Sequence, residues 1–185
     1  MNFNKHFKLK GQHAFLSASQ YHWIRDDEKK LIKRYNNSQS SKRGSELHEY
    51  AEKAIRLGIK QAKSKKTLNA YINDAIGFKM KPEQIVYYSE NCFGTVDAIS
   101  FRENFLRIHD LKTGVSPASM DQLIIYAGIF CMEYDVDPQY ISIELRIYQN
   151  DEIVIFLPEP EDIYDIINII KRADKIINKC RMEEY

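Results

Sequence analysis

Residues 94–114 read GTVDAISFRENFLRIHDLKTG, and this stretch decides the fold. Two runs rich in β-branched and aromatic residues, 94–101 and 105–112, flank the short polar segment Arg102–Asn104, which predicts a β-hairpin. Because side chains alternate between the two faces of a strand, Asp110 and Lys112 are expected to point the same way. With Asp97 in the adjacent strand, two acids and a lysine should converge at one end of the hairpin.

Helices and strands are predicted on both sides of this hairpin. Downstream, the apolar helix Met120–Tyr134 precedes a second hairpin, Tyr140–Tyr148 with Glu152–Phe156, and a final helix over Glu161–Lys179. Upstream, three helices are predicted, over Gln20–Tyr35, Gly44–Ile59 and Leu68–Ile76. Residues 36–43 (NNSQSSKR) are predicted to form a polar loop, and Ile85–Tyr88 a strand. Ser17 and Ser19 offer two N-caps for the first helix.

This order of elements indicates one α/β domain spanning residues 1–185. Its centre is expected to be a mixed β-sheet flanked by helices. Residues 82–185 should form the β-rich core with the C-terminal helix, and residues 1–81 a helical, basic cap over the same core.

Charge is distributed unevenly along the chain. The formal net charge is only +1, but residues 1–81 carry 18 basic and 7 acidic residues, whereas residues 82–185 carry 9 and 19. Clustered cations gain free energy by releasing counterions from phosphates, so this polarity favours contact with nucleic acid. A single cluster, such as Lys60, Lys63, Lys65 and Lys66, is also compatible with an ordinary solvated face.

The composition, 44% hydrophobic and 29% charged, is that of a globular protein. No run approaches the roughly 18 apolar residues of a membrane helix, and the N-terminus lacks the apolar core of a secretory signal, so a cytoplasmic location is expected. The three cysteines, Cys92, Cys131 and Cys180, form no CxxC pair, and an odd number favours reduced thiols.

Asp97 and Asp110 both sit among apolar strand residues. Burying an ionised carboxylate is costly unless a cation or hydrogen bonds compensate, and two neighbouring carboxylates also repel each other. A divalent cation solves both problems, and oxygen ligands favour Mg²⁺ or Mn²⁺. Together with Lys112, such a site suits phosphodiester hydrolysis. The alternative is a surface hairpin whose Asp and Lys residues only flank a turn.

The segments Gly94–Asp97 and Asp110–Gly114 resemble the core of PD-(D/E)XK nucleases, especially the RecB-like and phage exonuclease branch. Three further segments resemble motifs of that branch, and the matches span residues 16–126 in the family's order. They are the opening serine segment Leu16–Ser19, the histidine-bearing helix Arg43–Glu49 (RGSELHE) and the Gln-x-x-x-Tyr helix at Gln122–Tyr126. The resemblance implies a restriction-endonuclease-like core.

The resemblance also implies roles for particular residues. His48, Asp97 and Asp110 would be metal ligands, with the Leu111 carbonyl as a further one, and Lys112 would act with Asp97 and Asp110 in catalysis. Gln122 and Tyr126 would complete the catalytic set, because residues four apart share one helical face. Val96 replaces the proline of the family's name, and Asp110 stands where many members have Glu; both changes keep the ligand chemistry. The four-cysteine signature of some relatives is absent, so no iron–sulfur cluster is expected.

The expected function is a Mg²⁺- or Mn²⁺-dependent deoxyribonuclease. By resemblance it is an exonuclease that processes double-stranded DNA ends in phage or mobile-element recombination and repair, with a single-strand annealing protein as partner. Endonuclease action, hydrolysis of RNA or a nucleotide, and a non-catalytic nucleic-acid-binding module on a nuclease fold stay open as alternatives. Strand polarity, strandedness, processivity and homo-oligomerisation are not determined by the sequence.

Overall fold

The computed structural model describes residues 5, 7–9, 11 and 14–183. The chain divides into two compact units, Met1–Arg43 and Gly44–Tyr185, and each is described by itself. The expectation of a single domain therefore stays a prediction. Among the described residues, no helix is both long enough and apolar enough to cross a membrane.

The N-terminal unit contains two 3₁₀ helices, η1 (Phe7–Leu9) and η2 (Ala18–Arg25), and the first half of α1 (Glu28–Leu57). The single helix predicted over Gln20–Tyr35 is wrong, because the chain leaves η2 at Asp26 in an extended conformation. Asp27 then caps α1 by accepting a hydrogen bond from the Lys30 N–H at 2.8 Å. Ser17 occupies the N-cap position of η2 but makes no capping bond with its side chain.

The polar loop predicted at residues 36–43 is also wrong, because this segment lies inside α1. Its Asn and Ser residues have weak helix propensity, yet the segment contains no proline. Helix propagation is cooperative once a neighbouring turn has formed, so a short polar stretch between two good helical segments continues the helix.

The second unit is built on a five-stranded sheet in the order β1-β2-β3-β4-β5. The strands are Lys81–Ser89, Cys92–Arg102, Phe105–Leu111, Ser142–Gln149 and Glu152–Phe156. β3 and β4 run parallel and the other neighbouring pairs run antiparallel, so the sheet is mixed, as predicted. The two predicted hairpin turns are confirmed: Glu103, Asn104, Asn150 and Asp151 all have positive φ, as tight hairpin turns require.

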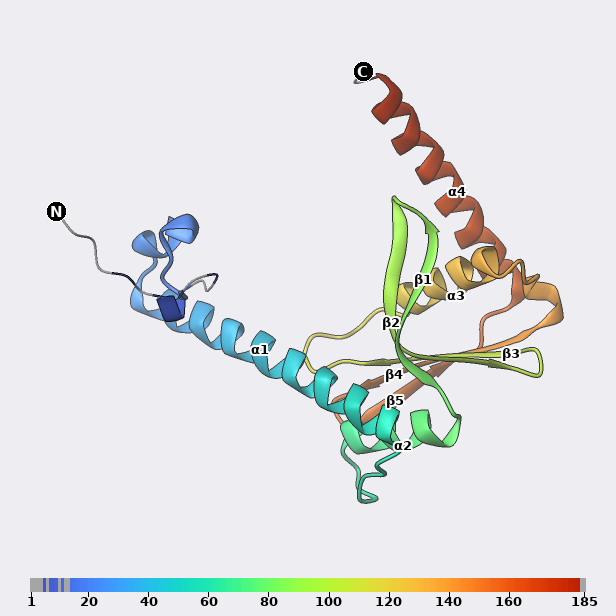
Figure 1. The fold of residues 1–185 in the computed structure, drawn as a ribbon, viewed down its shortest axis with the longest axis horizontal. Helices are drawn as coiled ribbons and strands as arrows, with labels where there is room; N and C mark the ends of the chain where they lie inside the picture. Colours follow the sequence, from blue (N-terminus) through green and yellow to red (C-terminus); the bar gives the residue numbers. More distant parts are fainter. Residues whose placement is uncertain (1–4, 6, 10, 12–13, 184–185) are drawn as a thin grey trace. The chain divides into compact units, whose positions relative to one another are not determined.

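Helices cover both faces of this sheet (Figure 1). On one face α3 (Asp121–Glu133), which makes the crossover from β3 towards β4, packs with α4 (Pro160–Glu183) over the larger apolar core. A Cβ on Gly128 would lie 2.8 Å from Ile166 Cγ2, so this glycine allows the close approach of α3 and α4. On the other face lie α2 (Thr67–Gly77) and the part of α1 after Gly44, with the smaller core. A short 3₁₀ helix, η3 (Pro138–Tyr140), precedes β4.

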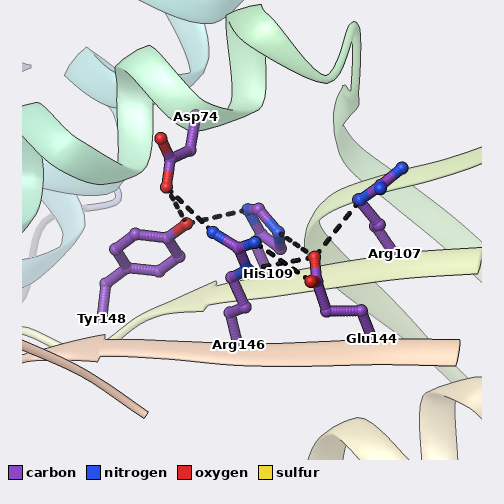
Figure 2. Close-up of polar contacts among 6 residues, drawn as sticks. All are labelled: Asp74, Arg107, His109, Glu144, Arg146 and Tyr148. Atoms are coloured by element: carbon purple, nitrogen blue, oxygen red, sulfur yellow. Dashed lines mark hydrogen bonds and ion pairs between the residues drawn. The ribbon is translucent and has the colours of Figure 1, made fainter. Parts of the chain in front are cut away.

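A partly buried polar cluster fills the space between α2 and strands β3 and β4 (Figure 2). Arg146 makes a bidentate pair with Glu144, with both N–O distances at 3.0 Å, and Arg107 Nε donates to the same carboxylate at 3.2 Å. On the α2 side, Asp74 accepts hydrogen bonds from the Tyr148 hydroxyl at 2.7 Å and from Arg146 at 3.2 Å. The two guanidinium groups and the two carboxylates therefore offset each other inside the cluster.

His109 sits at the centre of this cluster and is fully buried. Its Nδ1 lies 3.2 Å from the Tyr148 hydroxyl, which donates its own proton to Asp74; Nδ1 is therefore the protonated ring nitrogen. Its Nε2 has no hydrogen-bond partner among the described residues. Burial, together with the nearby Arg146 and Arg107, lowers the pKa of His109 to about 3, so the ring is neutral at physiological pH.

This lowered pKa predicts a pH-dependent loss of stability. An unfolded chain protonates its histidine near pH 6.5, whereas folded His109 does not until about pH 3. The unfolded state thus binds more protons between these values, and stability falls as pH decreases through that window, by up to about 1.4 kcal/mol per pH unit.

Urea unfolding of wild type and His109→Gln between pH 7.5 and 4.5 measures this effect, because contributions from other groups are common to both proteins. The stability of wild type relative to the variant should decline below pH 6.5. A difference that is constant across the range would contradict the assignment of a neutral, buried His109.

Candidate functional site

The candidate site lies at the end of β2 and β3 where the pairing between these two strands stops. The antiparallel register ends at Ala98 opposite His109, so the next residues along the two strands are Asp97 and Asp110. Asp110 is only 3% exposed, and the Asp97 side chain is 17% exposed. Asp110 lies close enough to raise the pKa of Asp97 by charge repulsion. The predicted convergence of the two carboxylates is therefore found in the structure.

A hydrogen-bonded chain links Asp110 to helix α3. Lys112 Nζ donates to Asp110 Oδ1 at 3.0 Å and to Gln122 Oε1 at 2.7 Å, and Gln122 Nε2 donates to the Tyr126 hydroxyl at 3.2 Å. Asp110 and Lys112 thus share one face of β3, and Gln122 and Tyr126 share one face of α3, as the spacing predicted. A Cβ on Gly94 would lie 2.8 Å from Tyr126 Cε1, so this glycine leaves room for the ring.

A second set of side chains meets at Asp97. One ligand atom from each of His48, Glu83 and Asp97 lies within 4.8 Å of the others, and His48 Nδ1 is 3.5 Å from Asp97 Oδ2. Gly44 lets α1 approach the end of β3, because a Cβ there would be 2.8 Å from Thr113 Oγ1. His48 lies one helical turn further along and is thereby carried to the carboxylates.

Glu83 was missed by the sequence analysis. It lies in β1 between Pro82 and Gln84, which pair with Ala98 and Val96 of β2, so it is directly across from Asp97. Its φ of 51° is left-handed, a conformation that costs a non-glycine residue about 1–3 kcal/mol and is often found at functional sites. The only signal in the sequence is an acidic residue next to a proline at the start of a strand, which is too weak to single it out.

The electrostatics of the site disfavour three ionised carboxylates without a compensating cation. Burial, followed by the charge of Asp110, raises the pKa of Asp97 to about 6, although His48 and a 2.9 Å hydrogen bond from the Leu111 N–H act in the opposite direction. Burial also raises the pKa of Glu83. Asp110 Oδ2 lies 3.0 Å from Lys112 Nζ but is buried and makes no hydrogen bond with any described group. The site therefore has an unsatisfied demand for positive charge.

The donors present fit a divalent cation. One ligand atom from each of three side chains lies within 4.8 Å of the others, a clustering from which a divalent ion could draw ligands. His48, Glu83 and Asp97 would hold the ion; Asp110 is not part of this group of three and is instead ion-paired with Lys112, so its predicted role as a metal ligand stays a prediction. A mixed set of imidazole and carboxylates suits Mn²⁺ as well as Mg²⁺.

The other residues singled out in the sequence have different outcomes. Leu111 contacts the site through its N–H, and the use of its carbonyl as a metal ligand stays a prediction. Ser17 and Ser19 belong to the N-terminal unit, where their hydroxyls lie 3.0 Å apart, and their resemblance to a family motif stays untested.

Comparison with known proteins gives no match: no family model, no curated protein and no solved structure is significantly similar to this chain. Membership of a nuclease family therefore stays a proposal that depends on the residues of the site.

The donor set predicts specific Mn²⁺ binding, measured by isothermal titration calorimetry on the whole chain. Glu83→Gln and Asp97→Asn should each weaken binding by at least roughly 10-fold, because each removes a direct ligand and even outer-shell changes cost that much. The matched control is Glu49→Gln, since Glu49 neighbours His48 in sequence but is exposed and paired with Lys53. Equal affinities in all four proteins would contradict the assignment.

Proposed function

We propose that this protein is a Mg²⁺- or Mn²⁺-dependent deoxyribonuclease with a PD-(D/E)XK-type site. The observation that carries the proposal is the meeting of two groups of polar side chains at one end of β2 and β3. One is the His48–Glu83–Asp97 set, and the other is the chain from Asp110 through Lys112 and Gln122 to Tyr126. A turn-flanking surface hairpin would not need a buried carboxylate, a lysine paired with it and a converging histidine together.

The residues divide the chemical work in a way that suits phosphodiester hydrolysis. A divalent cation, when bound, supplies Lewis-acid stabilisation of the phosphoryl oxygens. Lys112 places a fixed ammonium group next to the reacting phosphate, where it offsets the negative charge that develops there. Gln122 holds that ammonium group, and Tyr126 in turn holds Gln122, so the lysine is oriented before substrate arrives. Asp97 and Asp110 provide the negative charge that retains the cation.

A polyanionic substrate is favoured by the charges of the second unit. The segment between α1 and α2 presents Lys60, Lys63, Lys65 and Lys66, all of them exposed. Such clusters attract phosphate backbones through counterion release. We further propose an exonuclease that acts on DNA ends during recombination or repair, in a phage or mobile-element setting and beside a single-strand annealing protein. The support for these finer points is the motif resemblance alone.

The test is degradation of end-labelled linear duplex DNA and closed circular DNA with Mg²⁺ or Mn²⁺. Wild type should degrade linear DNA, and Lys112→Ala should be slower by about 100-fold or more, because it removes a preorganised charge at the reacting phosphate. Lys171→Ala, on an exposed position of α4, is the charge-matched control and should keep wild-type activity.

Each outcome of this experiment distinguishes between the alternatives. Cutting of the circular DNA as well would place the protein among the endonucleases. Faster hydrolysis of a matched RNA strand would change the substrate class. If wild-type protein with confirmed Mn²⁺ binding leaves all of these substrates intact, the nuclease proposal is wrong and a nucleic-acid-binding module becomes the better account.

A further inference from the structure

A groove lined by cations and aromatic rings lies on the second unit, away from the carboxylates. It is formed by the start of β1, the end of β2 and the C-terminal end of α3, and has a volume of about 430 Å³. Its charged lining residues are Lys79, Lys81 and Arg102, and no acidic residue lines it. None of these three cations forms an ion pair with any described carboxylate. The groove therefore presents uncompensated positive charge.

Three aromatic rings form a continuous surface in the same groove. The Phe130 and Tyr134 centroids are 4.8 Å apart, and the Phe101 and Phe130 centroids are 5.2 Å apart. Phe130 is buried, but Phe101 is 38% exposed and Tyr134 is 52% exposed, so two of the three aromatic side chains reach the surface. Exposed rings beside unpaired cations are the arrangement with which proteins bind single-stranded nucleic acid, because bases stack on the rings while phosphates contact the cations.

The groove and the candidate site share helix α3 and its C-cap. Tyr126, Phe130 and Tyr134 are spaced four residues apart on α3 and its C-cap, so they follow roughly one side of the helix. The rise from Tyr126 to Tyr134 is about 12 Å, since a helix advances about 1.5 Å per residue. Tyr126 belongs to the hydrogen-bonded chain that ends at Lys112. One part of α3 therefore carries a residue of the candidate site, and its C-terminal end lines the groove.

We propose that this groove binds a single-stranded segment of the DNA substrate, with phosphates on Lys79, Lys81 and Arg102 and a base stacked on Tyr134 and Phe101. The proposal rests on the nuclease function proposed above and specifies its substrate: the strand next to the scissile phosphate is held unpaired. The volume lies in the range of sites for small molecules, about 300–1,000 Å³, which suits a nucleotide unit of a single strand.

Fluorescence anisotropy with a labelled oligothymidine in EDTA tests the proposal, because binding is then measured without cleavage. The triple variant Lys79→Ala, Lys81→Ala, Arg102→Ala should bind at least about 10-fold more weakly, and the slope of log affinity against log salt should fall by about 2. The control Lys171→Ala, Arg172→Ala, Lys175→Ala removes the same charge from exposed positions of α4 and should bind like wild type. Tyr134→Ala should weaken binding about 5-fold or more and leave the salt slope unchanged.

Equal losses in the two triple variants would overturn the proposal, since the effect would then come from net charge alone. The proposal is also overturned if the groove triple variant loses more affinity for blunt duplex DNA than for oligothymidine. The two proposals fail separately. If the groove triple variant loses oligothymidine binding but the wild-type protein cleaves no DNA, only the nuclease proposal is refuted. If DNA cleavage depends on Lys112 but the groove triple variant binds oligothymidine like wild type, only the groove proposal is refuted.

Discussion

Two carboxylates held out of water at the same end of adjacent strands are the constraint on which the site depends. Asp110 is almost completely buried, and burial with mutual repulsion raises the pKa of Asp97 to about 6. Ionised carboxylates in such a place need compensating charge or hydrogen bonds. Lys112, His48 and the Leu111 N–H supply part of it. Lys112 is already paired with Asp110, and the raised pKa values of Asp97 and Glu83 mark the place where a divalent cation would add compensating charge.

A second charged cluster of the same domain, between α2 and strands β3 and β4, shows how the fold treats partly buried charge that needs no ion. Glu144 is paired with Arg146 and Arg107, and Asp74 is bonded to Tyr148 and Arg146, so the acids and cations of that cluster balance (Figure 2). The site around Asp97 combines more acid with a single lysine and one histidine. The contrast between a balanced and an acid-rich cluster in one domain supports a structural role for the first and a cation-binding role for the second.

The sequence predicted the strands, their hairpin turns and the long helices of the second unit well, because hydrophobic periodicity and turn residues act locally. It also placed Asp110, Lys112, Gln122 and Tyr126, since their spacing within one strand or one helix fixes their direction. It failed at residues 36–43, where helix cooperativity outweighed weak local propensity. Glu83 was missed because its contribution depends on the pairing of β1 with β2 and on a left-handed φ, neither of which a local pattern encodes.

The central claim is that His48, Glu83 and Asp97 build a cation site next to Asp110. The most direct test is a crystal structure of the protein soaked in MnCl₂, with anomalous diffraction data collected at a wavelength where manganese scatters strongly. The claim predicts an anomalous peak bound by these three residues, with a carboxylate oxygen of Asp110 at or near the ion. An occupied manganese position elsewhere, with the three side chains unliganded, would contradict it.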